Sequence, residues 1–469
     1  MHSTVNGQPR LSLWRHVREY AVPQSMIRSA TARRAVGDWA GACAAARVDV
    51  DLDLRAVARS HGRELAARLR TDLRHLAPDL LRWHLPRVTP DGLVRPGLTL
   101  PLARYQRDGG GTVHLVARTP PGWADGGQRF SLALWDEAAP GNHAAAHPHR
   151  RPNPRFRLDL HRHLWDARRS AELRTRAGLD VPAGESTLDP ELAGLRELGY
   201  AVDRWADEAA LLLRAENRVD AGAVAVRLGG RRRLLLELTG GPDGVRLVSG
   251  PAARHTTGLP LLPDAATWVP PDVLLLREGL IGADRLHPLV AAALAPDHPT
   301  AGPVEAPTGP RLVECRGAQH RIGLVDGVLV PLDHDPAEIR REELLAALTG
   351  TPLACLRAID EVHRQPEQLA DIRARLDHGD TVGALTVVEN LLGPEATLPD
   401  GVLRDELATA ALRQVSYGLF RAGLADTTRS IHTRPAHRPR DHRGHPRNAR
   451  HSVTRGPADP DQRPLRLHP

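Results

Sequence analysis

Five histidines lie close together near the middle of the chain and could serve as metal ligands. Within 21 residues the sequence places His143, His147, His149, His161 and His163. Imidazole and carboxylate groups are the usual protein ligands of catalytic zinc and iron, and Asp166 follows three residues later. A metal-dependent hydrolase is therefore one hypothesis, with His161, His163 and Asp166 as its candidate ligands.

A solvated loop explains the same histidines without a metal. The first three belong to residues 136–157, a stretch rich in Pro, Ala, His and Arg that the composition predicts to be a linker. The other two fall in a segment with a helical pattern, residues 158–177, where side chains two positions apart do not share a face. We prefer the loop interpretation and predict neither a bound metal nor another cofactor.

Cys315, His320 and Asp333 form a second candidate set. A thiol beside an imidazole can act as a nucleophile with its base, and a carboxylate can orient the ring. Cys315 at the end of one strand could face His320 at the start of the next. A buried cysteine and a histidine at an exposed turn would give the same pattern, and we favour that interpretation. The sequence thus assigns no catalytic residue and favours a protein that is not an enzyme.

Three acidic residues near the N-terminus alternate with apolar ones. In a strand, Asp49, Asp51 and Asp53 would lie on one face, where they could bind a divalent cation. An edge strand with a solvated acidic side is the simpler explanation, and we adopt it.

Lysine is absent, so all 63 positions counted as Lys or Arg are arginine. This excludes lysine-dependent phosphate loops, protein kinases and Schiff-base enzymes. Together with abundant Ala, Gly and Pro, it indicates a high-GC bacterial genome. Residues 427–469 contain ten Arg and three Asp, which equals the whole net charge of +7. The remainder balances 53 Arg (63 − 10) against 53 acidic residues (56 − 3).

The cysteine count and the lack of long apolar segments indicate in which cellular compartment the protein is expected. Three scattered cysteines without a C-x-x-C motif fit a reducing environment. The N-terminal residues lack an apolar run of signal-peptide length, and no window resembles a membrane span. We therefore expect a cytoplasmic protein.

The clearest helical pattern covers residues 23–87. Its apolar line recurs at spacings of four, four and three, which places Leu65, Leu69, Leu73 and Leu76 on one helix face. Pro78 is predicted to open a further short helix. Gly37 and Asp38 suit the end of one helix and the N-cap of the next, which predicts a helical hairpin.

Period-two patterns predict short strands further along the chain. Residues 98–105 and 112–118 flank a glycine-rich turn, and residues 129–135 supply a third strand. Two meanders are predicted over residues 223–248 and 311–332. Residues 336–423 again have helical patterns.

These patterns predict an α+β fold, with helical N- and C-terminal regions around a middle of short antiparallel β-hairpins or meanders. The predicted divisions are a loose N-terminal arm (1–20), a helical region with a β-hairpin (21–135), a linker (136–157), a central α+β region (158–294), a second linker (295–310), a short β-meander followed by a helical region (311–426) and a disordered Arg/His/Pro-rich tail (427–469).

Two short segments far apart in the chain are alike. Residues 37–42 and 379–384 match at four of six positions, and both separate predicted helices. Tetratricopeptide-type repeats use a similar Gly-Asp junction. Stable arrays need about three or more repeats, so we prefer independent use of the same helix stop and start.

The tail has too few apolar residues to form a core. Its composition also matches a high-GC gene read out of frame, so its biological reality stays open. Nucleic-acid binding through its arginines is an alternative function.

Three runs carry a resemblance to a known family. They are SATARRAVGDWAGACAAARVDVDLDL, RHLAPDLLRWHLPR and FRLDLHRHLWD. With them the chain resembles, as far as Leu424, a family of uncharacterised actinobacterial proteins. The resemblance implies genes beside a MoxR-type ATPase and a von Willebrand A-domain protein, and therefore a protein partner. A cytoplasmic interaction or adaptor protein, accessory to such a system, is the leading functional expectation.

Overall fold

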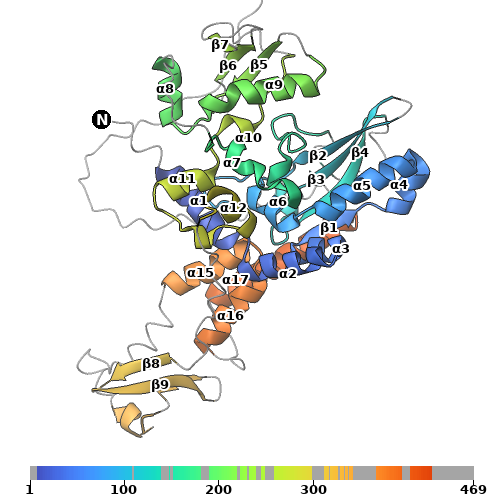
Figure 1. Ribbon diagram of the computed structural model, residues 1–469. Helices are drawn as coiled ribbons and strands as arrows, with labels where there is room; N and C mark the ends of the chain where they lie inside the picture. Colours follow the sequence, from blue (N-terminus) through green and yellow to red (C-terminus); the bar gives the residue numbers. More distant parts are fainter. Residues whose placement is uncertain are drawn as a thin grey trace, which may run out of the picture. The chain divides into compact units, whose positions relative to one another are not determined.

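The computed structural model describes most of the chain outside its C-terminal end (Figure 1). The described residues are 8–107, 110–138, 147, 151–180, 190–218, 222–229, 232–238, 245–248, 258–297, 311–315, 317–325, 328–331, 333–335, 337–341, 366–392 and 402–424. The chain divides into a unit of residues 1–427 and a second unit of residues 428–469. The predicted tail, half of the first predicted linker and most of the second lie outside the described residues.

Six helices form the N-terminal region. They are α1 (Gln8–Tyr20), α2 (Gln24–Ala35), α3 (Trp39–Ala45), α4 (Leu54–His61), α5 (Arg63–His75) and α6 (Pro78–His84). The expectation of a loose arm over residues 1–20 is wrong for its larger part. Val17 and Arg18 of α1 are buried, so this helix is packed into the main core rather than free.

The apolar line of the longest predicted helix is confirmed. Leu65, Leu69 and Leu73 are buried along α5, while Arg70 is exposed on its other side. Leu76 is buried just beyond the end of the helix, and Pro78 occupies the first turn of α6.

The two similar Gly-Asp segments have the same local structure. Asp38 and Asp380 accept hydrogen bonds from the backbone N–H three residues on, at 2.8 Å and 3.2 Å. A Cβ atom at Gly41 or Gly383 would lie about 2 Å from these carboxylates, which explains the second glycine of each segment. The likeness thus reflects one helix-capping geometry, used between α2 and α3 and again before α16.

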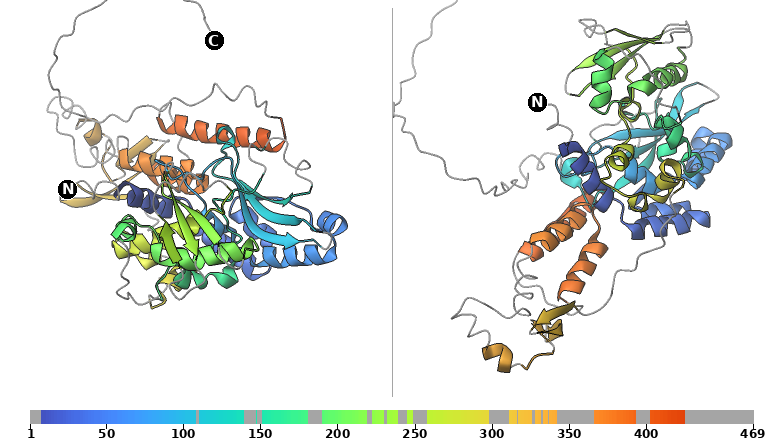
Figure 2. Two further views of the ribbon diagram at one scale, coloured as in Figure 1. Left: turned by 90° about the horizontal axis from the view of Figure 1, so that it is seen from above. Right: turned by 60° about the vertical axis from the view of Figure 1, so that its left-hand side comes forward.

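A four-stranded sheet packs against the N-terminal helices (Figures 1 and 2). Its order is β1 (Val48–Asp51), β4 (Phe130–Asp136), β3 (Thr112–Arg118) and β2 (Thr99–Gln106). The three later strands pair antiparallel as predicted, and Asp49 and Asp51 lie in edge strand β1, parallel to β4, whereas Asp53 lies beyond its end. A short 3-10 turn, η1 (Gly122–Ala124), precedes β4.

The helix predicted over residues 158–177 is wrong. The chain instead forms two 3-10 turns, η2 (Arg162–Leu164) and η3 (Ala167–Arg169), and the short helix α7 (Glu172–Arg176). Trp165 is fully buried and its carbonyl accepts from the Ala77 N–H at 2.8 Å. Tertiary contacts with the start of α6 therefore replace the hydrogen bonds that a continuous helix would make.

The central region has its own core beside a three-stranded antiparallel sheet. The sheet order is β5 (Gly222–Arg227), β6 (Arg233–Leu238) and β7 (Val245–Val248), as predicted. The surrounding elements are α8 (Pro190–Glu197), η4 (Val202–Arg204), α9 (Trp205–Ala215) and α10 (Asp264–Thr267). Two further helices, α11 (Pro271–Arg277) and α12 (Pro288–Leu294), add apolar residues to the N-terminal core, and the 3-10 turn η6 (Ala283–Arg285) lies between them in the chain.

The C-terminal part contains the second predicted meander and three longer helices (Figure 1). The strands are β8 (Arg311–Cys315), β9 (Ala318–Val325) and β10 (Val328–Pro331). The helices α15 (Pro366–Asp377), α16 (Thr381–Leu392) and α17 (Val402–Arg421) share a small apolar core. These elements complete an α+β fold. Of the helices that the structure describes, none is long and apolar enough to cross a bilayer.

The apolar face of α5 supports a stability prediction. Leu69 and Leu73 are completely buried, and each Leu→Ala change at such a site costs about 2–5 kcal/mol. Because a domain has only about 5–15 kcal/mol to lose, Leu69→Ala with Leu73→Ala should unfold or severely destabilise the N-terminal region. Urea denaturation followed by circular dichroism measures the loss.

The matched control is the exposed residue Arg70 on the same helix. Arg70→Ala should change the free energy of unfolding by less than about 0.5 kcal/mol. If Arg70→Ala lowered the free energy of unfolding more than the double leucine variant does, the arginine face would be the buried one.

Candidate functional site

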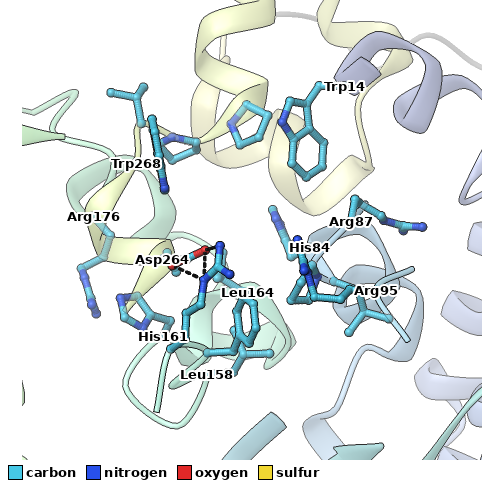
Figure 3. Close-up of a pocket in the computed structure, with 18 of the residues that line it drawn as sticks. Trp14, His84, Arg87, Arg95, Leu158, His161, Leu164, Arg176, Asp264 and Trp268 are labelled. Carbon is cyan, nitrogen blue, oxygen red and sulfur yellow. Dashed lines mark hydrogen bonds and ion pairs between the residues drawn. The ribbon is translucent and has the colours of Figure 1, made fainter. Parts of the chain in front are cut away.

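A cavity of about 420 Å³ lies between the N-terminal helices and the central region (Figure 3). Its lining comes from segments far apart in the sequence. Four contributions are α1, residues 84–95, residues 155–176 and residues 264–271, and Glu208 of α9 adds one side chain. Such a volume suits a small organic molecule.

One face of α1 forms a wall of the cavity. Arg10, Leu13, Trp14 and Arg18 all line it, at spacings that align side chains on a helix. Arg18 is fixed by a buried bidentate ion pair with Asp272, at 2.6 Å and 2.8 Å, and donates to the Trp83 carbonyl at 2.7 Å. Since both charges are buried, this pair anchors α1 to α6 and α11.

Six arginines line the cavity, but only two carboxylates do. Arg155 pairs with Asp264 and Arg176 with Glu208, each with contacts of 2.6 Å, and Arg18 has Asp272 behind the wall. Within the part of the chain that the structure describes, the other three arginines have no carboxylate within ion-pair distance; they are Arg10, Arg87 and Arg95. The lining therefore carries an excess of positive charge.

These three guanidinium groups are held by weaker partners. Arg10 lies over the ring of Trp268, 3.9 Å from its centroid, and Tyr200 stacks on the same tryptophan at 3.8 Å. Arg87 donates to the Arg82 carbonyl at 2.6 Å. The Nε atoms of Arg87 and Arg95 are buried and have no hydrogen-bond partner among the described atoms.

Burial makes the charged form of the cavity arginines less favourable relative to the neutral form. It lowers the pKa of Arg87 to about 9, and the nearby Arg18 adds to the shift. Burial likewise lowers the pKa of Arg10 and of Arg95. A bound anion would supply the missing countercharge and hydrogen-bond acceptors.

Aromatic and apolar side chains complete the lining. Figure 3 shows Trp14 and Trp268 along one side of the cavity, with His84, Arg87 and Arg95 grouped at another. Flat rings beside guanidinium groups suit a planar ligand that carries negative charge.

The histidines of the lining include two of the predicted metal ligands. His161 and His163 have their ring centroids 5.8 Å apart. The Nδ1 of His161 lies 2.9 Å from the Arg157 carbonyl, and its Nε2 lies 3.2 Å from the Glu208 carboxylate. Burial lowers the pKa of His163 well below its ordinary value, so this ring is neutral at pH 7.

The remaining metal candidates do not join this pair. Asp166 is buried and accepts hydrogen bonds from Arg162 and Arg168 at 3.1–3.4 Å. His147 is buried with its Nε2 2.9 Å from the Thr119 carbonyl, while His143 and His149 lie outside the described residues. The part of the chain that the structure describes contains no group of three or more His, Cys, Asp or Glu able to hold a metal.

Cys315 and His320 are not directly opposite each other in the sheet register. Ala318 lies opposite Cys315, and Val313 lies opposite His320. The His320 ring stacks on His334 at 4.2 Å. Hydrogen bonds from Arg321, at 2.7 Å and above, lower the pKa of Asp333 to about 2. Asp333 thus binds an arginine rather than orienting the histidine.

The three residues of the acidic run, Asp49, Asp51 and Asp53, all bind other groups of the protein. Asp49 accepts from Arg129 and from the Tyr417 hydroxyl, and Asp51 pairs with Arg421. Asp53 caps α4 by accepting from the Arg55 N–H at 2.8 Å. The three carboxylates therefore serve structural roles, two of them in holding α17.

Comparisons with protein-family models, with curated proteins and with solved structures found no match.

The cavity itself was missed at the sequence level. The spacing of Arg10, Trp14 and Arg18 was an available signal, since it places two arginines and a tryptophan on one helix face. Nothing in the sequence shows that residues 84–95 and 264–271 meet that face.

The buried His84 gives a pH-dependent prediction. Burial lowers its pKa from 6.5 to about 3; the nearby Arg18 and Arg87 add to the shift, and Asp272 opposes it. The unfolded state therefore binds a proton below pH 6.5 that the folded state does not. Stability should fall with pH from 6.5 toward 3, by about 1.4 kcal/mol per pH unit for this one group.

His84→Asn should remove that contribution and reduce the slope of the profile below pH 6.5 by about 1.4 kcal/mol per pH unit. Urea midpoints at each pH, compared with wild type, measure the slope. An unchanged slope in the variant would show that His84 is protonated as readily in the folded chain as in the unfolded one.

Proposed function

We propose that the protein binds a small organic anion with a flat apolar part in this cavity. The observation that carries the proposal is the set Arg10, Arg87 and Arg95, which line the aromatic cavity and have no carboxylate partner among the described residues. Charges withdrawn from water are normally paired, so the buried Arg87 together with the half-buried Arg10 and Arg95 indicates a counterion that arrives with a ligand.

Binding is favoured over covalent catalysis. The lining residues include no serine, cysteine or tyrosine, and Thr89 is their single hydroxyl. The lining imidazoles His84 and His163 are neutral at pH 7 and can exchange hydrogen bonds with polar atoms of the ligand. A metal-dependent hydrolase receives no support from the described residues.

An adaptor role with a protein partner stays a proposal that the family resemblance motivates. Ligand binding is compatible with an adaptor role, because a small molecule in a cavity lined by α1 could change the position of that helix. Nucleic-acid binding through residues 427–469 likewise stays a prediction.

Matched probe molecules test the ligand class. The aromatic anion 2-naphthoate should raise the melting temperature and quench tryptophan fluorescence, because it offers both charge and a flat ring. The control 2-naphthalenemethanol lacks the charge, and acetate lacks the ring. At the same concentration each should change the melting temperature and the fluorescence much less than 2-naphthoate does. Equal responses to naphthoate and the uncharged alcohol would contradict an anion site.

Arginine variants connect the response to the cavity. Arg95→Gln should weaken naphthoate binding about tenfold or more, since a hydrogen bond to a charged group contributes about 1.5–3 kcal/mol. Arg70→Gln removes an exposed arginine on α5 and should leave the titration unchanged. Equal losses in both variants would show that binding depends on overall charge rather than on this cavity.

A further inference from the structure

The unpaired arginines of the cavity lie at two different ends of it. Figure 3 shows Trp268 on one side of the cavity and Arg87 and Arg95 together on another. Arg10 belongs to the Trp268 side, because its guanidinium group lies over that indole, 3.9 Å from the ring centroid. We call these two places the Arg10 end and the Arg87–Arg95 end.

The electrostatic surroundings confirm that the two ends are distinct. Burial lowers the pKa of both Arg10 and Arg87. Tyr200 and Asp264 oppose the shift at Arg10, whereas Arg18 adds to the shift at Arg87. Neither Arg10 nor Arg87 affects the pKa of the other, so one small anionic group cannot neutralise both guanidinium groups.

The charge of the lining sets the charge that a ligand needs. Six arginines line the cavity, and three of them pair with a carboxylate; these are Arg18, Arg155 and Arg176. The other three (6 − 3) are the arginines of the two ends. A ligand with one negative charge would leave two of them without a countercharge, and it would leave one end of the cavity empty of anion.

We propose that the ligand of this cavity is an aromatic dicarboxylate, with one carboxylate at the Arg10 end and the other at the Arg87–Arg95 end. This inference rests on the proposed function and adds the number and the placement of the negative groups. The middle of such a molecule is flat and uncharged. It suits the part of the lining where Arg155 and Asp264 already neutralise each other, with contacts of 2.6 Å.

The geometry of Arg10 favours a carboxylate at its end. A guanidinium group that lies over an aromatic ring keeps its N–H donors at the edge of its plane, where they match the two oxygens of a carboxylate. Arg10 lies over Trp268 in this way, and no described atom accepts a hydrogen bond from it. Its donors are therefore available to a ligand that packs against the same tryptophan.

Pairs of probes that differ by one charge test the proposal on the full chain. Terephthalate, 2,6-naphthalenedicarboxylate and 4,4′-biphenyldicarboxylate hold two carboxylates at increasing separations. The monomethyl ester of each has nearly the same shape and one charge fewer. In calorimetric titrations at least one diacid should bind about tenfold or more tightly than its own ester, because the second carboxylate gains charge-assisted hydrogen bonds.

The outcomes separate this inference from the proposed function. If the esters and 2-naphthoate bind but no diacid binds more tightly than its ester, the dicarboxylate is wrong and the anion site stands. If neither the diacids nor 2-naphthoate binds, both proposals are overturned.

Variants of α1 locate the second carboxylate. Arg10→Gln should lower the affinity of the preferred diacid to that of its ester, while the ester, bound at the Arg87–Arg95 end, should change by less than about twofold. Arg10→Lys keeps the charge and should retain part of the preference for the diacid. Arg15→Gln removes an exposed arginine of the same helix that does not line the cavity, and should leave both affinities unchanged. An unchanged preference in Arg10→Gln, or an equal loss for diacid and ester, would overturn the placement of a carboxylate at Arg10.

Discussion

The arrangement around the cavity depends on the ion pair between Arg18 and Asp272, which are 254 residues apart in the chain. Both side chains are almost fully buried, and Asp272 also accepts from the Trp83 indole N–H at 3.2 Å. Charges without water need a complete set of partners, so the positions of α1, α6 and α11 are mutually constrained. Those three elements form much of the cavity wall, and removal of either charge would leave the other one buried and unpaired.

The arginines withdrawn from solvent differ in how completely protein atoms satisfy their guanidinium groups. Arg82 is completely buried without a carboxylate, yet it donates to the carbonyls of Ala46, Gln128 and Arg47 at 2.8–3.4 Å. Its role is structural, because backbone oxygens satisfy its guanidinium group. Arg87 also donates to the carbonyls of Arg82 and Gly92, but its Nε atom, like that of Arg95, is buried without a hydrogen-bond partner among the described atoms, and both residues line the cavity. Arginine is the only long basic side chain in this sequence, so the environment alone separates these roles.

Local patterns predicted the elements well where one face of an element is apolar. The leucine line of α5, the proline at the start of α6 and the strands of both meanders needed only neighbouring residues. The same reasoning failed for residues 158–177, because Leu158, Leu164 and Trp165 are buried by contacts with distant segments. Apolar spacing indicated burial there but could not distinguish helix from turns held by tertiary hydrogen bonds.

The sequence by itself determined the α+β class, the helix caps at Asp38 and Asp380 and the excess of charge in residues 427–469, since these follow from residue types and short spacings. The tertiary structure alone decided which polar groups have partners. It joined His161 to Glu208, Asp333 to Arg321 rather than to His320, and Asp49 to Arg129 and to Tyr417 of α17. Pairing of charges depends on distances across the fold, and residue spacing along the chain does not contain those distances.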